Sequence, residues 1–556
     1  MRLKAWILKR PVPDHIFSLA CILLCSTIYT WPLLSHLRTA IPGEPQLTDV
    51  TLYLWSVGWV RFALTHGLSL TSTDYIFVPF GADLRLDAQQ LLQAVAAFPF
   101  TNILGVVGAF NLILVISFSL NGILAYFFVH SLTRNPQAAL IAAVLLMLSG
   151  VVAWHFILGR SAIPALWIVI ASVWAAKSLL EQPDLRKGLL LGLLLLAASY
   201  SDFHTLLFSV ISVGAYLIRE FMSGRGAFPR PQISTLLLAL LVWGIPFGFF
   251  YLPELVSARA NGYVTPRLPE IAAYSFPLAD FADPGKIPYI YGFDFLLIVV
   301  AAVIVFRWRG EYRYWLGASL FMLFLSLGPY LQPYTFPLPY AVVSLWPPLM
   351  QFRTPYRFTL PALVGLTVVA GYLFSHLLSR VPAAYQRWGI ALLLIVGRLW
   401  YAQSLYPFET QTYPDYDFYR WVAEVPGDFT IMEVPFGFRT GLEKIGEGGD
   451  GLQYYQHIHG KRLLNASVSR LPVAVFEFYR SRPILMFLAG EAAAERDVLD
   501  KDFADTLVWS NTRYVVVHRS RLPRDYAERI LAFLEEQPRL EFFLTEDDLL
   551  VYQVRN

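Results

Sequence analysis

Long apolar stretches alternate with short polar linkers through the first four hundred residues of the chain. A helix that crosses a bilayer needs about 20 apolar residues, because the hydrocarbon layer is about 30 Å thick. The pattern therefore predicts a polytopic α-helical membrane protein with about eleven transmembrane helices. The predicted spans are 16–37, 103–131, 136–156, 162–180, 188–200, 203–219, 233–253, 290–306, 313–330, 357–379 and 387–405.

The two short spans at 188–200 and 203–219 have an alternative, which is one long helix over 188–219. The polar break from Ser199 to His204 suits a tight turn between two helices. Two helices also keep the basic linkers before and after them on the same side of the membrane. We therefore predict two short helices.

Basic residues gather at the N-terminus and in every second linker. Cytoplasmic loops of membrane proteins carry an excess of Lys and Arg. The pattern predicts a multi-pass protein of the cell membrane with a cytoplasmic N-terminus and an extracytoplasmic C-terminus. The first apolar stretch is long and no small-residue cleavage pattern follows it, so we expect a retained helix rather than a signal peptide. The basic linker residues are Arg134, Lys177, Arg186, Lys187, Arg219, Arg225, Arg230, Arg307, Arg309, Arg313, Arg380 and Arg387.

The segments on the predicted outer side are long, at 38–102, 254–289 and 331–356. Loops longer than about 15 residues are usually functional. Inside the first of them, 50–68 carries Leu52, Trp55, Trp59 and Phe62 at helical spacing. This spacing predicts an amphipathic helix that lies on the membrane surface.

The tail differs from the rest in its hydrophobic pattern. Apolar runs at 428–435 and 513–518 predict buried strands, and 541–544 with 549–553 predicts a terminal strand pair. Helical patterns cover 416–424, 473–489, 492–510 and 524–536. We therefore predict a transmembrane domain over 1–405, with its long first outer loop at 38–102, followed by a soluble extracytoplasmic α/β domain over 406–556.

Composition agrees with a membrane protein and narrows the partners. Apolar residues make up 56% of the chain and charged residues only 15%, against about 25% in a soluble domain. The net charge of +3 gives no reason to expect nucleic acid as a partner. Cys21 and Cys25 lie one turn apart in the first span, so we interpret them as two buried thiols rather than a disulfide or a metal site.

Ionisable groups near membrane depth are costly and therefore mark candidate functional residues. Asp49, in the first outer loop, is a candidate general base or metal ligand. Its alternative role is a helix N-cap shared with Thr48. Asp83 and Asp87, later in the same loop, could contribute to an acceptor or metal site, or could be turn and cap groups.

Two further pairs lie at the outer ends of predicted spans. His155 and Arg160 lie between the third and fourth spans, and Asp202 and His204 lie between the fifth and sixth. A cation there could bind phosphate and a carboxylate could bind sugar hydroxyls. The alternative is the ordinary polarity of helix ends, with Arg reaching toward water.

Arg353 and Arg357 enter the tenth span beside aromatic and proline residues. Guanidinium groups suit phosphate oxygens because they donate two parallel hydrogen bonds, whereas the alternative role is anchoring at the interface. A weaker set, Glu254, Arg259 and Tyr263, follows the seventh span.

The segment 453–461 contains two histidines that alternate as they would on a strand. His457 and His459 would then share one face of that strand. A third metal ligand is not evident, so a structural or binding role outweighs a zinc site.

Four segments carry a resemblance to a known family: Asp49 with Trp55 and Trp59, then 75–84, 352–358 and 453–461. With the inward N-terminus, the outer tail and about eleven spans, they resemble the GT-C-fold membrane glycosyltransferases. More narrowly, they are similar to bacterial YfhO-type and related uncharacterised polytopic proteins. The resemblance covers most of the chain.

The resemblance implies a hexosyl- or pentosyltransferase of the cell envelope that uses a polyprenyl-phosphate sugar donor. The acceptor would be a glycan, lipid or protein at the extracytoplasmic face. It implies Asp49 as catalytic base and Arg353 and Arg357 as ligands of the lipid phosphate. GT-C enzymes often carry two neighbouring acids in the first loop, whereas here the nearest is Glu44, so a divalent cation is allowed for but not assigned.

Two other function classes stay open. The first is a non-catalytic membrane protein that binds a glycan or partner through its outer domain. The second is a lipid or solute transporter, which would favour ionisable groups deep in the spans and two matching halves.

Overall fold

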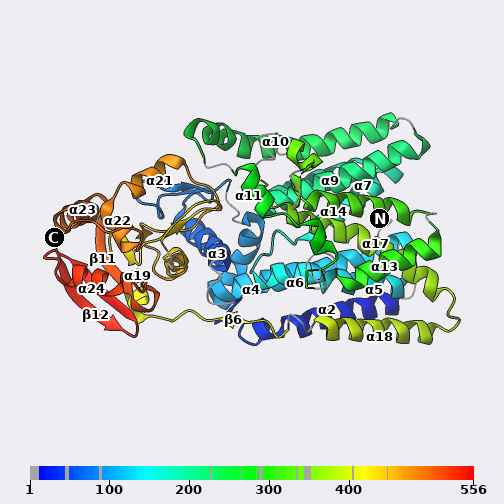
Figure 1. Cartoon of the computed structure of the whole chain (residues 1–556). Helices are drawn as coiled ribbons and strands as arrows, with labels where there is room; N and C mark the ends of the chain where they lie inside the picture. The colour runs from blue at the N-terminus through cyan, green and yellow to red at the C-terminus, as the bar shows by residue number, and fades with distance from the viewer. Residues whose placement is uncertain are drawn as a thin grey trace. The chain divides into compact units, whose positions relative to one another are not determined.

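The computed structural model describes residues 12–43, 49–86, 90–225, 228–263, 266–283, 285–286, 292–307, 310–332, 336–343, 352–402, 406–446 and 449–555. The chain divides into two compact units (Figure 1). Unit 1 comprises 1–44, 111–247 and 266–411. Unit 2 comprises 45–110, 248–265 and 412–556. Unit 2 thus contains parts of two predicted outer loops, which a division at residue 405 leaves out.

Unit 1 is built from apolar helices that run side by side (Figure 1). Helix α17 packs against α14, α5 and α13, and α7 packs against α8 and α9. The helices are α2 (Val12–Leu34), α5 (Pro136–Met147), α6 (Gly150–Ile157), α7 (Leu166–Glu181), α8 (Leu185–Ser201), α9 (Phe203–Glu220), α11 (Leu268–Ala273), α13 (Phe293–Phe306), α14 (Tyr312–Ser326), α15 (Pro339–Val343), α17 (Thr359–Leu378) and α18 (Ala384–Tyr401).

Short turns and strands complete unit 1, and two long helices contribute residues to both units. The turns are η1 (Phe221–Arg225), η2 (Leu278–Phe281) and η3 (Pro355–Phe358), and the strands are β1 (Ile41–Pro42), β4 (Tyr330–Leu331), β5 (Phe336–Pro337) and β6 (Thr410–Gln411). The two long helices are α4 (Leu91–Thr133) and α10 (Arg230–Asn261).

The predicted number of eleven membrane spans is not confirmed. Among the described residues, five helices are long and apolar enough to cross a bilayer, or six if the bent pair α5 and α6 forms one span. Several other apolar helices are too short for this test: α13 has 14 residues and α14 has 15, or about 21–23 Å at 1.5 Å per residue. The five are Asp14–Leu34, Leu91–Thr133, Phe203–Ser223, Arg230–Ser257 and Pro355–Leu378.

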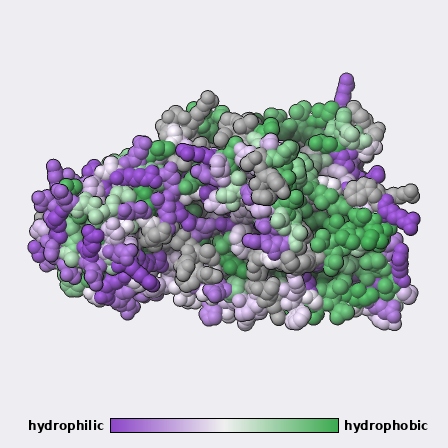
Figure 2. All heavy atoms as spheres, viewed as in Figure 1, coloured by the Kyte–Doolittle hydropathy of each residue, from purple (hydrophilic) through white to green (hydrophobic). Residues whose placement is uncertain are grey.

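The surface of unit 1 fits a multi-pass membrane protein. Figure 2 shows apolar residues gathered over its helices, and many of the side chains concerned are strongly exposed. Ile245 on α10 is 65% exposed, Leu297 on α13 is 69% exposed and Leu393 on α18 is 73% exposed. Large exposed apolar patches of this kind mark contact with lipid or with other proteins.

The prediction of two helices rather than one over 188–219 is confirmed. Helix α8 ends at Ser201 and α9 begins at Phe203, with Asp202 between them in an extended conformation. The Asp202 carboxylate accepts a hydrogen bond from the backbone N–H of His204 at 2.7 Å, which caps α9. A polar residue with a strong capping preference therefore separates two apolar helices.

Unit 2 is built around a five-stranded mixed sheet in the order β10-β7-β11-β13-β12. Strands β10, β7 and β11 are parallel, and β11, β13 and β12 are antiparallel. The four predicted strands of the tail correspond to β7, β11, β12 and β13, and are confirmed. The sheet consists of β7 (Thr430–Val434), β10 (Arg462–Leu463), β11 (Thr512–His518), β12 (Leu540–Glu546) and β13 (Leu549–Val554).

Helices and two small hairpins complete unit 2. The predicted helix over 473–489 is broken at Pro483 into α21 and α22, because proline does not continue a helix beyond its first turn. The elements are α3 (Asp49–His66), α19 (Asp417–Glu424), η5 (Asp450–Tyr455), α20 (Gln456–His459), α21 (Val473–Arg480), α22 (Pro483–Leu488), α23 (Arg496–Trp509), η6 (Arg519–Arg521), α24 (Ala527–Glu535), β2 (Ser72–Thr73), β3 (Ala82–Asp83), β8 (Phe438–Arg439) and β9 (Lys444–Ile445).

Helix α3 exists as predicted, but it is not an amphipathic helix on a surface. Every residue from Val50 to Val60 is buried, and the helix packs within unit 2 against η5 and α20. The indole N–H of Trp55 donates to the Gln456 side chain at 2.7 Å, and Trp55 stacks on Trp59. The aromatic residues that suggested a membrane interface are core residues of a folded unit.

The strand predicted for His457 and His459 is also wrong. Both residues lie in the short helix α20, which ends at Gly460 with a φ of 63°. A residue without a Cβ adopts this left-handed conformation at little cost, so glycine ends the helix here. Alternation over three residues cannot distinguish one helical turn from a strand.

The contact between α3 and α20 should control the stability of unit 2. A Cβ atom added at Gly58 would lie 2.7 Å from Cβ of His457, so Gly58→Ala should destabilise the unit by about 1–2 kcal/mol. The matched control is Gly248→Ala in α10, because a Cβ there meets nothing within 4 Å. The measurement is thermal unfolding of the purified variants. An unfolding temperature of Gly58→Ala equal to that of wild type would contradict the packing.

Candidate functional site

Five of the predicted site residues come together in unit 1. His155 and Arg160 lie at the end of α6 and just after it, Asp202 and His204 lie at the start of α9, and Arg357 lies in η3 before α17. We call these five residues the cationic cluster. The segments that carry them are about 200 residues apart at the extremes, and they meet because each is the polar end of an apolar helix.

His204 is the central residue of the cationic cluster. Its Nδ1 lies 2.8 Å from Oδ1 of Asp202, and its Nε2 lies 3.2 Å from Nη1 of Arg357 and 3.2 Å from Oγ1 of Thr354. The same Nη1 of Arg357 also lies 3.4 Å from Nδ1 of His204, so this guanidinium nitrogen contacts both ring nitrogens. The short contact between Nδ1 and Asp202 orients the imidazole toward the carboxylate.

Arg160 joins the same network from the other side. One of its Nη atoms lies 3.4 Å from Nδ1 of His155, and its guanidinium lies over the Trp154 ring. The hydroxyl of Tyr356 is hydrogen-bonded to Arg160 and also to Arg357, whose Nε lies 3.5 Å from it. Tyr356 thus joins the two arginines.

Three members of the cationic cluster are buried, and His204 and Arg357 are half-buried. Arg160 and Asp202 are each 7% exposed, and His155 is 0% exposed. Among the described residues, two guanidinium groups and one carboxylate belong to the cluster, so its net charge is +1 when the imidazoles are neutral. The Nε2 atom of His155 is buried and has no hydrogen-bond partner among the described residues. Guanidinium groups that can donate hydrogen bonds in such a site suit an anion such as phosphate.

Arg353 lies next to the cationic cluster in sequence. Its guanidinium is 5.0 Å from the centre of the Tyr274 ring, at a distance typical of a cation–π contact. The ring of the preceding residue, Phe352, lies 5.1 Å from that of His204. Residues 344–351 of the predicted loop lie outside the described residues.

Asp49 belongs to unit 2 and begins α3. Its carboxylate accepts a hydrogen bond from Nη2 of Arg439, and the two side chains are 35% and 29% exposed. Arg439 lies on β8, 390 residues later, and nothing in the sequence pattern indicated this pairing. As an acid in the first turn, Asp49 also interacts favourably with the helix dipole. Glu44 and Thr48 lie outside the described residues.

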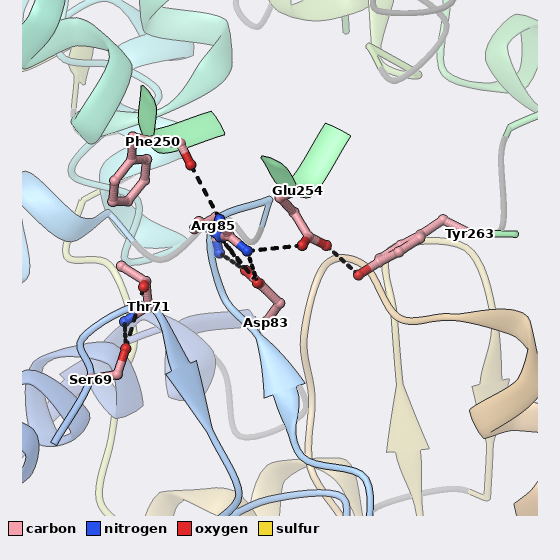
Figure 3. A network of polar contacts seen from close by, with 7 residues as sticks. All are labelled: Ser69, Thr71, Asp83, Arg85, Phe250, Glu254 and Tyr263. Atoms are coloured by element: carbon pink, nitrogen blue, oxygen red, sulfur yellow. Dashed lines mark hydrogen bonds and ion pairs between the residues drawn. The ribbon is translucent and has the colours of Figure 1, made fainter. Parts of the chain in front are cut away.

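Asp83 is part of a second polar network in unit 2 (Figure 3). The Arg85 guanidinium lies 2.5 Å from the Asp83 carboxylate and 3.2 Å from that of Glu254, which in turn accepts a hydrogen bond from the Tyr263 hydroxyl at 2.5 Å. Burial, followed by this hydrogen bond, raises the pKa of Tyr263, so the phenol stays a neutral donor.

The sequence pattern pointed to Asp83, Glu254 and Tyr263 but not to Arg85. The signal was available, because an arginine two residues after an aspartate in a turn can bond back to that carboxylate. The network links β3 to the end of α10 inside unit 2. Asp87 lies outside the described residues, as does the side chain of Arg259.

Of the two histidines of α20, His459 is buried and His457 is half-buried. Burial lowers the pKa of His457 to about 4 and that of His459 to about 3. Nδ1 of His459 accepts a hydrogen bond from the backbone N–H of Lys461 at 2.9 Å. Among the described residues, no group of three or more His, Cys, Asp or Glu side chains is placed to hold a metal ion. The residues described here therefore do not form a recognisable metal centre.

Comparison with known proteins supports the fold. No protein-family model and no curated protein matches the sequence. The oligosaccharyltransferase of Archaeoglobus fulgidus in its apo form has a TM-score of 0.50 at 11% identity, covering 91% of this chain and 70% of the archaeal chain. Arabinofuranosyltransferase AftD from mycobacteria has a TM-score of 0.51 at 14% identity, covering 98% of this chain. This chain spans only 42% of AftD.

Both of these structures have the GT-C fold. The expected resemblance to GT-C glycosyltransferases is therefore confirmed at the level of fold. At identities of 11% and 14%, the likeness says nothing about which side chains react. The chemistry of this chain is therefore inferred from the side chains of the cationic cluster.

Unit 2 should lose stability in mild acid because of the α20 histidines. Their lowered pKa values mean that the unfolded chain binds protons below pH 6.5 while the folded unit does not. Stability is therefore full above pH 6.5 and falls between pH 6.5 and pH 4, by up to about 1.4 kcal/mol per pH unit for each histidine.

Thermal unfolding between pH 7 and pH 5 measures this effect. The variant His459→Gln should show a shallower loss of stability with falling pH than wild type. His66→Gln, which changes an exposed histidine of α3, is the matched control and should behave as wild type. Equal pH dependence in wild type and His459→Gln would refute the role of His459.

Proposed function

We propose that this chain is a membrane glycosyltransferase that uses a sugar carried on a polyprenyl phosphate or pyrophosphate. The acceptor is a hydroxyl of a glycan, lipid or protein at the extracytoplasmic face. The observation that carries the proposal is the cationic cluster, in which the buried Arg160 and the half-buried Arg357 lie together at helix ends of a GT-C fold. Membrane lipid is a partner whichever acceptor is used.

The cationic cluster is assigned to the phosphate of the donor. Phosphate oxygens accept charge-assisted hydrogen bonds from guanidinium groups, and a buried site strengthens them because little water competes. Asp202 and His204 hold the Arg357 guanidinium in place before the donor binds. Less conformational entropy is therefore lost on binding. Arg353 is the further arginine that we assign to the lipid phosphate.

The transfer step is a direct displacement at the anomeric carbon. The acceptor oxygen attacks that carbon, the bond to the phosphate oxygen breaks, and its electron pair leaves with the polyprenyl phosphate. The guanidinium groups stabilise the charge that develops on the leaving oxygen. The acceptor proton passes to a carboxylate, for which we assign Asp49. This sequence inverts the configuration of the sugar carbon.

Two points of the proposal are kept broad. The sugar is a hexose or a pentose, and the steps above use only side chains of this chain. A divalent cation remains compatible with the proposal but has no assigned ligands here. The acid network of Asp83, Arg85 and Glu254 is not given a role in the transfer.

Arg357 should control the use of the donor. The change Arg357→Met removes charged hydrogen bonds to phosphate, so kcat/KM for a polyprenyl-phosphate sugar should fall by about 10- to 100-fold. The measurement is loss of donor and release of polyprenyl phosphate by purified protein in lipid. Arg380→Met, at the exposed far end of α17, is the matched control and should keep wild-type turnover. Equal kinetics for the two variants would remove the phosphate role of the cationic cluster.

Asp49 should be required for turnover rather than for folding. Asp49→Asn removes the base and should lower kcat by about 100- to 10,000-fold. Arg439→Gln breaks the same ion pair but leaves the carboxylate in place, so it separates the two roles. We expect Arg439→Gln to retain most activity at an unfolding temperature close to that of Asp49→Asn. If both variants lose activity and stability together, the ion pair is structural and the base assignment is wrong.

A further inference from the structure

Unit 1 contains a cavity of about 390 Å³ that belongs neither to the cationic cluster nor to the transfer step. It lies where α7 and α9 end and α14 begins. On α9, His204 of the cationic cluster is in the first turn and Arg219 of the cavity is in the last. Their separation of 15 positions corresponds to about 22 Å of helix. The cavity is therefore at the opposite end of the same helices.

The cavity wall carries charges of both signs with one extra carboxylate. Glu181, Glu220 and Glu311 face Lys177 and Arg219. Arg219 forms ion pairs with Glu220 and Glu311, and Lys177 forms one with Glu181. A carboxylate accepts up to about four hydrogen bonds, so each can bind a further donor. The wall thus offers sites for an anionic group and, more strongly, for a cationic one.

Aromatic faces add to the attraction for a cation. Tyr216, Trp315 and Tyr372 line the cavity. The guanidinium of Arg219 already lies 5.7 Å from the centre of the Tyr216 ring, and the rings of Tyr216 and Trp315 stack at 6.2 Å. Ring faces attract cations through their quadrupoles, most strongly where water is excluded. Rings and surplus carboxylate therefore act in the same direction.

Exposed apolar side chains neighbour the charged wall residues in sequence. Ile218 is 66% exposed and Met222 is 77% exposed, and they precede and follow Arg219 and Glu220 in sequence. Leu132 and Leu180 line the cavity itself. A ligand with a charged head and apolar chains would satisfy both surfaces at once. A small soluble ion would leave the apolar residues without a partner.

We propose that this cavity binds the head of a zwitterionic membrane lipid in which a primary ammonium is joined to a phosphate. The ammonium donates to the carboxylates of Glu220 and Glu311 beside the rings, and the phosphate accepts from Lys177. A primary ammonium has three N–H donors, so it bonds carboxylates where a quaternary ammonium cannot. A lipid with a net negative head meets the surplus carboxylate and is disfavoured.

Lipid binding to the purified protein tests the proposal. Native mass spectrometry of detergent-solubilised protein, titrated with phosphatidylethanolamine, phosphatidylcholine and phosphatidylglycerol in parallel, gives the affinity for each. Phosphatidylethanolamine should bind about tenfold more tightly than the other two, the effect of one charged hydrogen bond. Equal binding of the three lipids, or tighter binding of phosphatidylglycerol, would overturn the proposal.

Two variants locate the effect at the cavity. Glu311 is 57% exposed on its side chain, so Glu311→Gln should fold normally and lose the preference for the ethanolamine head. Glu409→Gln, at an exposed glutamate elsewhere in unit 1, is the matched control and should keep it. Retention of the preference in Glu311→Gln would place the lipid somewhere else and sink the assignment.

Free phosphoethanolamine distinguishes a lipid from a soluble source of the same chemistry. If the apolar rim contributes, the soluble head alone should compete for the cavity only at concentrations at least about 100-fold higher than the lipid, because the chains add buried apolar area. Competition by the soluble head at equal concentration would show that the lipid assignment is wrong.

Discussion

Charged side chains buried at the ends of apolar helices need partners, and the chain of hydrogen bonds through Asp202, His204 and Arg357 provides them in unit 1. Asp202 caps α9 and lies 2.8 Å from Nδ1 of His204, and the His204 ring in turn contacts Nη1 of Arg357. Leaving one of these groups unpaired would cost several kcal/mol, since burial penalises a charge that has no counterpart. The apolar helices can therefore end where they do only because these polar groups meet.

The charges that this constraint brings together determine which sign of ligand the cationic cluster attracts. Asp202 lies beside His204 and Arg357, while Arg160 contacts an imidazole, a tyrosine hydroxyl and an indole ring. Guanidinium groups oriented in this way attract an anionic ligand. At the far end of α9 the balance is reversed, because three carboxylates face two cations. One helix thus carries an anion-attracting end and a cation-attracting end.

Sequence patterns were reliable where one physical cause decides the structure. Apolar runs located the helices of unit 1, and strand patterns located β7, β11, β12 and β13. The sequence indicated His155, Arg160, Asp202, His204 and Arg357 as separate candidates at polar helix ends, and the structure brings them together. Patterns failed where partners come from distant segments. Helix α3 resembled a surface helix because its contacts with α20 lie about 400 residues away in sequence. For the same reason, Arg439 could not be recognised as the partner of Asp49. The number of spans is not confirmed, because apolar character does not fix helix length.

Fold and chemistry therefore rest on different observations in this protein. The GT-C fold is shared with structures that are only 11% and 14% identical to it, so packing of apolar helices suffices to conserve the architecture. That packing says little about a carboxylate at the start of α3. Asp49 is held by Arg439 within unit 2, and an ion pair with one-third-exposed partners contributes only about 0–1 kcal/mol to folding. A pair of so little structural value can be changed without unfolding the protein, which is why exchanging either partner separates a chemical role from a structural one.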